Sequence, residues 1–464
     1  MLREVFSEKE LQKKAVASGF YKRKCDFTPA MFFDMLLYCA SRIENISLSQ
    51  ACTNVKRCHG LKITKQSIDG RFTEEAVWFV KEVLKDLLER QLNKVFCPEL
   101  FTKFNHVRIK DSTKFLVADH LSEHFKGCGG IAGTSQACVC IQYEYDLRSG
   151  KILDLNVTDG TRNDSTDASE TKGKINKNDL VLRDLGYFNL SVLTGFADQK
   201  AFFVSRLNTS VLAFDTETQE QICFKELYVQ MSKQQLTQCE KQVLVGKQAQ
   251  AKLRLVVQIV PEQVYQERIR KINKKNKEKG WTTSEDYKAR CWFNLFITNV
   301  PAEDLSVKEV LMLYRLRWQI ELMFKSWKSV CKIDKIQPVK YERFACLLFA
   351  KLILIMLNMQ IICNLQAHYF KKQRLILSEN KCFKTLRESF NNLRGIWKEK
   401  RKRSEKELIG LASHFSSNHW KEKRKNKMSF LEIIDLLICK SDNYEYIKGI
   451  KKGTKSQPRP LIIN

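Results

Sequence analysis

Apolar residues recur at helical spacing through the first hundred residues of the chain. One apolar patch covers residues 32–37, and a longer run has its apolar positions three and four apart: Val77, Phe79, Val80, Val83, Leu84, Leu87 and Leu88. No alternating, strand-like pattern interrupts these two segments. The pattern therefore predicts a helical region over residues 1–100.

From residue 104 the pattern changes to short segments rich in β-branched and aromatic residues. Three of them follow one another, NHVRIKD, ACVCIQYEYDL and KILDLNVTDG, with the turn RSGK between the second and the third. A polar loop over 158–178 then leads to DLVLRD, the amphipathic NLSVLTGFA, and KAFFVSRL. An antiparallel meander followed by strand, helix and strand is the order of the ribonuclease-H fold, a mixed sheet covered by helices.

Strand-like segments return over residues 208–300, for example LRLVVQIV and CWFNLFITNV, and a basic loop, RIRKINKKNKEKGW, separates them. Because this block divides the expected core, we interpret it as a β-rich insertion. The predicted class is therefore α/β, a ribonuclease-H-like mixed sheet with a β-rich insertion, flanked by helical N-terminal and C-terminal regions. Its predicted parts are a helical region (1–100), the first part of the core (101–207), the insertion (208–300), the second part of the core (301–370) and a basic helical region (371–464).

The charge balance indicates a polyanionic partner. The chain has 80 Lys and Arg against 52 Asp and Glu, a formal net charge of +28, so nucleic acid is favoured. Two basic runs, at 398–406 and 421–427, add to this surface. The charged N-terminus is unlike a signal peptide, and polar Lys351, Asn358 and Gln360 interrupt the apolar stretch 344–365. We expect a buried core helix there, a cytoplasmic protein and no membrane partner.

The segment LKITKQSIDGRF, residues 61–72, allows two interpretations. It carries Lys62, Lys65 and Arg71 around a Ser67 or Asp69 helix cap, so it could present a helix end to a phosphate. A solvated connection between two helices explains the same residues equally well.

The segment YRLRWQIELMFKSWK is the richest in candidate chemistry. At about 100° per residue, a stripe roughly 80° wide contains one carboxylate flanked by cations and a tyrosine: Tyr314, Arg317, Glu321, Lys325 and Lys328. An ordinary amphipathic helix with i,i+4 ion pairs is the alternative.

Two aspartates at predicted strand ends complete the pattern. Asp111 ends VRIKD, and Asp184 ends DLVLRD. Either aspartate alone is more often only a cap or turn former. Together with Glu321 they make three carboxylates that could hold hard divalent cations.

With these residues the chain resembles bacterial insertion-sequence transposases of the DDE class with the YREK signature, the family numbered four among insertion sequences. Its Tyr, Arg, Glu and Lys spacing is met at Tyr314, Arg317, Glu321 and Lys328, and its two aspartates match Asp111 in DST and Asp184 in DLGYF. The resemblance covers most of the chain and is weakest after about residue 380.

The resemblance implies a cut-and-paste transposase that binds double-stranded DNA, both transposon ends and target, as a homodimer in a prokaryotic cell. Asp111, Asp184 and Glu321 would be catalytic and hold two Mg²⁺ ions, or Mn²⁺, whereas Tyr314, Arg317 and Lys328, with Lys325 beside them, would contact DNA. No GK[ST] motif follows the glycines at 127–133, so use of ATP is not expected. The N-terminal helical region would bind DNA.

The resemblance also implies a hairpin intermediate in which a flipped base stacks on a tryptophan of the insertion. Trp292, in a predicted strand, and Trp281, in the basic loop, are the candidates. Two other functions stay open: a catalytically silent DNA-binding regulator derived from a transposase, and a ribonuclease-H-like nuclease without strand transfer.

Overall fold

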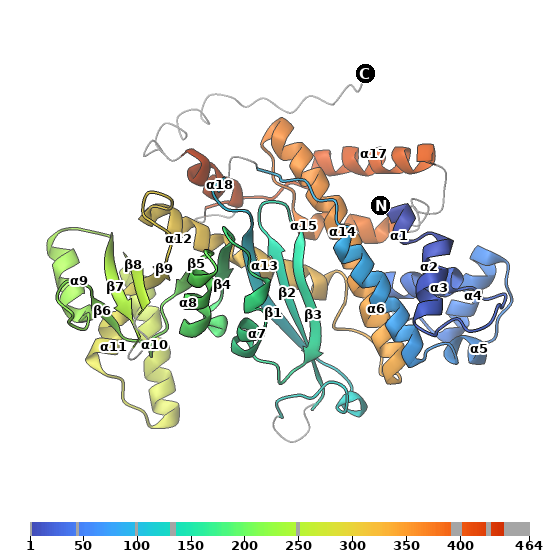
Figure 1. The fold of residues 1–464 in the computed structure, drawn as a ribbon, viewed down its shortest axis with the longest axis horizontal. Helices are drawn as coiled ribbons and strands as arrows, with labels where there is room; N and C mark the ends of the chain where they lie inside the picture. Colours follow the sequence, from blue (N-terminus) through green and yellow to red (C-terminus); the bar gives the residue numbers. More distant parts are fainter. Residues whose placement is uncertain are drawn as a thin grey trace.

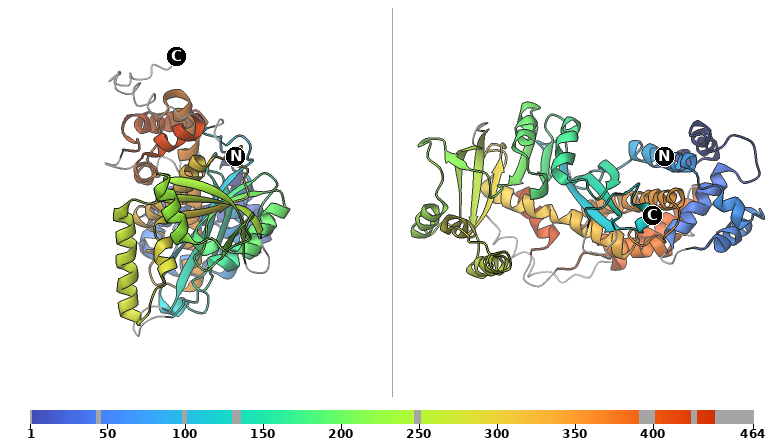
Figure 2. Two further views of the ribbon diagram at one scale, coloured as in Figure 1. Left: turned by 90° about the vertical axis from the view of Figure 1, so that its left-hand side faces the viewer. Right: turned by 90° about the horizontal axis from the view of Figure 1, so that it is seen from below.

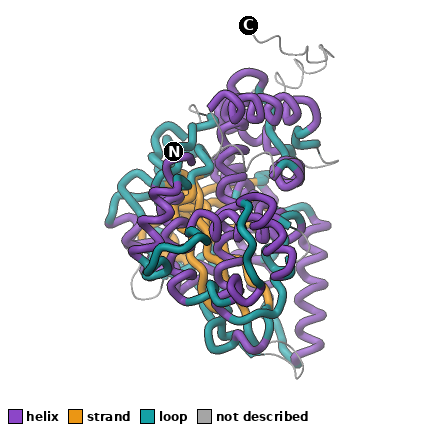
Figure 3. The backbone as a smooth tube through the Cα atoms, turned by 90° about the vertical axis from the view of Figure 1, so that its right-hand side faces the viewer, coloured by secondary structure: helices purple, strands orange, loops and turns teal. Residues whose placement is uncertain are grey.

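The fold is built on one mixed sheet of nine strands. The computed structural model describes residues 2–42, 46–97, 101–129, 136–246, 251–390, 401–423 and 428–439. The strands lie in the order β3-β2-β1-β4-β5-β9-β8-β7-β6, and helices surround them (Figure 3). The predicted α/β class is confirmed.

The first part of the sheet follows the predicted strand order. Its strands are β1 (Val107–Leu116), β2 (Cys138–Asp146), β3 (Ile152–Asp159), β4 (Leu180–Arg183) and β5 (Phe202–Arg206). The first three form an antiparallel meander, and β1, β4 and β5 pair in parallel, with α8 (Leu190–Asp198) connecting β4 to β5. The predicted polar loop 158–178 contains a short helix, α7 (Asp164–Glu170).

The insertion extends the same sheet. Its strands are β6 (Ala213–Asp215), β7 (Gln238–Val245), β8 (Ala251–Ile259) and β9 (Phe293–Thr298). Because β9 pairs with β5, the hydrogen-bonded ladder runs without a break from the core into the insertion (Figure 1). The insertion also contains the helices α9 (Phe224–Lys233), α10 (Glu262–Lys279) and α11 (Glu285–Arg290).

The prediction of a basic loop at residues 268–281 was wrong, because most of this segment is the helix α10. Its ion pairs Lys271–Glu267 and Lys274–Glu278 have the i,i+4 spacing that supports a helix. Tyr265 and Ile272 face the protein from the same side of the helix, where both are half-buried. The many charges of this segment suggested a loop, although its narrow apolar face supports a helix.

Six helices precede the sheet in the described residues: α1 (Leu2–Val5), α2 (Glu8–Ala17), α3 (Pro29–Ser41), α4 (Leu48–His59), α5 (Lys65–Asp69) and α6 (Glu74–Glu89). They form one apolar core with α14 (Tyr341–Gln373), against which α3 and α6 pack (Figures 1 and 2). Thr64 caps α5 through a hydrogen bond from the Ser67 backbone amide. The prediction that Ser67 or Asp69 caps this helix was therefore wrong.

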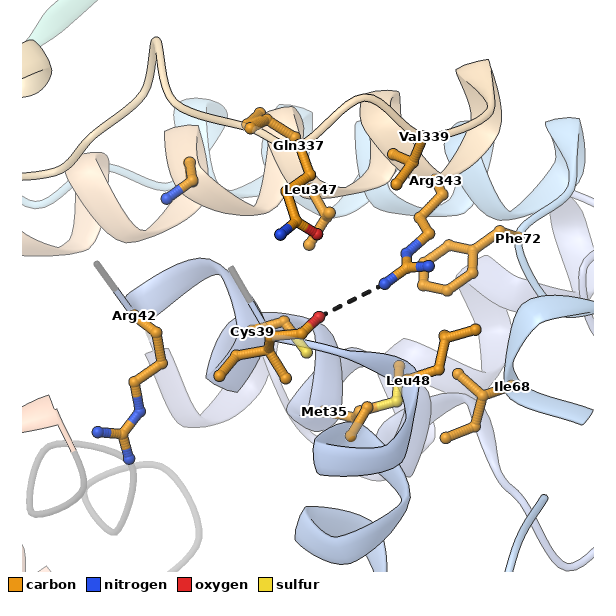
Figure 4. A pocket seen from close by; sticks show the side chains of 14 residues that line it. Met35, Cys39, Arg42, Leu48, Ile68, Phe72, Gln337, Val339, Arg343 and Leu347 are labelled. Atoms are coloured by element: carbon orange, nitrogen blue, oxygen red, sulfur yellow. Dashed lines mark hydrogen bonds between the residues drawn. The ribbon is translucent and has the colours of Figure 1, made fainter. Parts of the chain in front are cut away.

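The helix α14 is a core element, as its interrupted apolar pattern predicts. Among the described helices it is the one long and apolar enough to cross a membrane, but 78% of its most apolar window is buried inside the protein. Lys351 is 6% exposed and donates hydrogen bonds to the carbonyls of Ala40 and Cys331. Figure 4 shows a second polar link, in which Arg343 donates to the Ile46 carbonyl across a cavity of about 30 Å³.

In the described residues, the C-terminal part contains α15 (Glu379–Glu388), α17 (Arg401–Asn418) and α18 (Phe430–Cys439), and α18 packs on α12 (Val307–Leu316). The basic run at 398–406 lies almost wholly outside the residues whose side chains are described, and so does most of the run at 421–427.

Candidate active site

The sheet brings the first two candidate carboxylates together. The parallel pairing of β1 with β4 ends at Lys110 and Arg183, so the next residues are Asp111, still in β1, and Asp184, directly after β4. Asp111 was predicted at a strand end, but β1 continues to Leu116 because β2 still pairs with it. The strand end that matters belongs to β4, which stops directly before Asp184.

The third carboxylate lies on a helix that crosses this region. The segment predicted as one helix is two, α12 and α13 (Trp318–Ser329), which meet at Arg317. Arg317 keeps helical backbone angles, but its amide bonds to the Tyr314 carbonyl and its carbonyl accepts from Ile320, both three residues away. The helix is thus locally tightened, as in a 3₁₀ turn, one turn before Glu321.

One guanidinium contacts all three carboxylates. The Nη1 atom of Arg317 lies 3.3 Å from Asp111 Oδ2, and its Nη2 atom lies 2.8 Å from Glu321 Oε1 and 3.5 Å from Asp184 Oδ1. Residues from β1, from the turn after β4 and from α13 therefore converge, although 73 and 137 positions separate the carboxylates along the chain.

The cluster has more negative than positive charge. Burial is the main cause that raises the pKa of Asp111 to about 6, and Asp184 and Glu321 add to it, against the lowering effects of the Ser112 amide and Arg317. Burial disfavours the charge of Arg317, but the carboxylates outweigh it and raise the pKa of the guanidinium. One cation therefore does not neutralise the three carboxylates.

Tyr314 and the two lysines lie around this cluster without touching its carboxylates. The Tyr314 hydroxyl donates to the Arg183 carbonyl at 3.3 Å and so joins α12 to the end of β4. Lys328 donates to the Lys114 carbonyl at 2.8 Å, farther along β1. Lys325 is exposed on α13.

The two tryptophan candidates differ in accessibility. Trp292 is stacked between Tyr265 and Tyr228, with ring centroids 3.9 and 4.7 Å away. A base could therefore stack on Trp292 only after displacing one of these tyrosines. Trp281 is 55% exposed, and Trp318, which the sequence analysis did not single out, is 53% exposed beside Arg317.

Sequence reasoning also missed a basic cavity beside the carboxylates. It has a volume of about 320 Å³, and its lining includes Leu185, Arg206, Arg268, Lys271 and Arg290. The Arg206 side chain forms no ion pair within the described part of the chain, and its charge acts on Tyr314. The sequence offers one sign of this cavity: the apolar strand β5 ends in an arginine, in VSR at 204–206.

The donor chemistry of the three carboxylates fits a hard divalent cation. Within the described residues, no three His, Cys, Asp or Glu side chains lie close enough together to hold a metal ion. The carboxylates point toward one guanidinium instead, which supplies the positive charge. Carboxylate oxygens are the ligands that Mg²⁺ and Mn²⁺ prefer.

Comparisons with known proteins show the family to which this chain belongs. Residues 103–358 match the family described as transposase DDE domain. The transposase for insertion sequence element IS231F of Bacillus thuringiensis subsp. israelensis is 32% identical over 387 residues, which cover 80% of this chain and 81% of that relative. The chain belongs to the DDE transposases of insertion sequences.

Other relatives extend the DDE transposase match toward both ends. The IS231C transposase of Bacillus thuringiensis subsp. berliner is 28% identical over 462 residues, 96% of this chain and 95% of its own length. The IS1151 transposase of Clostridium perfringens is 29% identical over 408 residues, 84% of this chain and 86% of its own length. Membership in the family implies dependence on a divalent metal, and the matched region contains all three carboxylates.

Proposed function

We propose that this transposase binds the ends of its insertion sequence, cleaves the DNA there and transfers the freed strands by a cut-and-paste reaction. The observation that carries the proposal is the convergence of Asp111, Asp184 and Glu321 on Arg317. The parallel β1, β4 and β5 beside an antiparallel meander support a ribonuclease-H-like core. Asp111, Asp184 and Glu321 would hold two Mg²⁺ or Mn²⁺ ions.

The chemistry supplied by two such cations is activation of the attacking water or 3′ hydroxyl and stabilisation of the departing oxygen. In the chain itself, Arg317 pairs with the three carboxylates while no DNA is bound. For the carboxylates to accept divalent ions, the guanidinium must turn away. A phosphate is a suitable new partner, because a guanidinium binds phosphate with two parallel hydrogen bonds.

The remaining cations near the cluster would hold the DNA backbone. Arg206 borders the basic cavity. Lys328, on α13, reaches the Lys114 carbonyl of β1, and Lys325 is exposed on the same helix. Tyr314 would keep α12 against β4 while these side chains bind phosphates. The N-terminal helices would add a separate DNA-binding region, and a homodimer would bring two ends together.

An exposed aromatic ring would be needed if the reaction passes through a hairpin, because flipping a base costs a few kcal/mol. Trp281 and Trp318 expose their rings, whereas Tyr265 and Tyr228 cover both faces of Trp292. We therefore favour the two exposed tryptophans over Trp292 for such a role.

The test uses a supercoiled plasmid that carries the DNA flanking the coding frame on both sides, with Mg²⁺ or Mn²⁺ added. Asp111→Asn, Asp184→Asn and Glu321→Gln should each lower cleavage by about 1000-fold or more, because the site supplies several kcal/mol of transition-state stabilisation. All three should keep their affinity for DNA. Cleavage at the wild-type rate by any of these variants would refute the site.

The same assay separates the alternative functions. A regulator without catalysis would bind but never cleave the plasmid. A ribonuclease-H-like nuclease would cut without joining the freed ends to a target plasmid, which sequencing of the products detects.

A further inference from the structure

The helix α10 carries many more cations than it can pair. Residues 268–279 contain seven Lys and Arg against one Glu. Outside the two ion pairs of Lys271 and Lys274, none of the other exposed cations of this helix forms an ion pair with a described residue: Arg270, Lys275, Lys277 and Lys279. Such crowding of like charges destabilises the free protein and is relieved by a bound polyanion.

The helix is exposed but firmly attached. None of its 18 residues is buried, and it extends past the edge of the sheet as the long yellow helix of Figures 1 and 2. Arg268 holds it to the sheet by donating to the carbonyls of Cys291 and Phe293 at 2.9 and 2.8 Å. An element fixed in this way can present side chains at defined positions.

Three cations share the outer side of this helix. At about 100° per residue, Arg270, Lys274 and Lys277 fall within about 60° of arc, roughly opposite the half-buried Ile272. They span about 10 Å along the helix axis at about 1.5 Å per residue. About the same length of duplex carries three phosphates on one strand.

The base of the helix borders the candidate active site. Lys271 and Ile272 line the basic cavity together with Leu185, the residue after Asp184. At the far end, Lys275 and Lys279 lie 5.4 and 4.8 Å from the centre of the exposed Trp281 ring. A continuous basic surface therefore leads outward from the carboxylates.

We propose that α10 is an arm that binds the phosphate backbone of duplex DNA as it leaves the active site, through Arg270, Lys274 and Lys277. The choice of DNA rests on the proposed function. A membrane surface is a poor occupant, because residues 273–279, NKKNKEK, contain no apolar side chain, and the single exposed ring of Trp281 beside them does not make the apolar face of an interfacial helix. The contact is with phosphates, so it holds DNA of any sequence.

The test replaces the three outer cations at once, in Arg270→Gln/Lys274→Gln/Lys277→Gln. A matched control removes three exposed charges from α14 and α15, in Lys371→Gln/Lys372→Gln/Lys384→Gln. Affinity for a short duplex of arbitrary sequence is measured over a series of KCl concentrations. Each lost phosphate contact makes the negative slope of log affinity against log salt shallower by about 0.9. The slope of the arm variant should therefore be shallower by about 3 than that of the wild type.

The control should keep the wild-type slope. An unchanged slope in the arm variant, or an equal loss in the control, would overturn the proposal. Tighter binding of the wild type to phosphatidylserine vesicles or to an RNA duplex, lost in the arm variant, would also overturn it in favour of that partner. Asp111→Asn should retain the full slope, so a failure of the carboxylate assignment would show in cleavage and not in this measurement.

Discussion

The two faces of strand β1 carry opposite arrangements of charge. On one face Arg108 and Lys110 are buried, and each contacts two carboxylates. The buried pairs are Arg108 with Glu144 and Asp179, at 2.7 and 3.1 Å, and Lys110 with Asp154 and Asp167, at 2.8 and 2.5 Å. On the other face Asp111 shares the single cation Arg317 with two further carboxylates.

The difference lies in how completely the charges are matched. In the buried network three of the four carboxylates have a second cation: Glu144 also pairs with Arg183, Asp154 with Lys174 and Asp167 with Arg162. These charges are paired within the protein, so the network holds the strand in place and leaves no charged group to bind an outside ligand. The face of Asp111 keeps an excess of carboxylates at partly exposed positions. Unmatched charge beside an ordered sheet is typical of a site that binds an ion.

The largest effect should come from breaking the matched face. Lys110→Met leaves Asp154 and Asp167 partly uncompensated in a buried place, so the free energy of unfolding should fall by about 3–5 kcal/mol. Urea unfolding followed by circular dichroism measures it. Lys325→Met, at an exposed position, should change it by less than about 0.5 kcal/mol. A loss below about 1 kcal/mol for Lys110→Met would contradict the structural role of the network.

For the face of β1 that carries Asp111, the sequence was sufficient to predict the strand order but not the contacts of Arg317. Strands β4 and β5 are short apolar runs with clear ends, so the strand order could be predicted, although β1 continues five residues past Asp111, its predicted end. The contacts of Arg317 could not, because they depend on three elements meeting in space. Its helical stripe places it near Glu321 alone.

Two features that the sequence did not reveal have the same physical origin. The stack of Trp292 between Tyr228 and Tyr265 joins residues far apart in the sequence, so no local pattern reveals that both ring faces are covered. The helix α10 was predicted as a loop because charge outweighs its narrow apolar face. Tertiary contacts determine both structures, and the periodicity of the sequence does not reveal such contacts.

A smaller effect should come from a buried cation without a carboxylate in contact. Lys351 donates only to carbonyls, and burial lowers its pKa from 10.5 to about 8. Between these values the unfolded chain binds more protons, so this lysine makes stability rise as pH increases from about 8 to 10.5. Lys351→Met should remove that rise and stabilise the protein below pH 8 by at most about 3 kcal/mol.

Thermal unfolding of wild type and Lys351→Met at matched pH values tests this prediction. Other groups titrate in the same range, so the difference between the two proteins is the quantity to follow. Parallel stability curves for the two proteins would contradict it.

The smallest effect concerns competition for the unmatched carboxylates. If Arg317 takes the place of a divalent ion, Arg317→Gln should bind Mn²⁺ about tenfold more tightly without DNA, since about 1.4 kcal/mol of ion pairing no longer has to be broken. Isothermal titration calorimetry of the DNA-free protein measures this directly. Lys325→Gln removes the same charge from α13, the helix that begins directly after Arg317, without touching a carboxylate, so it corrects for long-range attraction. Equal affinities for the two variants would mean that Arg317 does not compete with the ion, and weaker binding by Arg317→Gln would mean that the guanidinium instead positions the carboxylates.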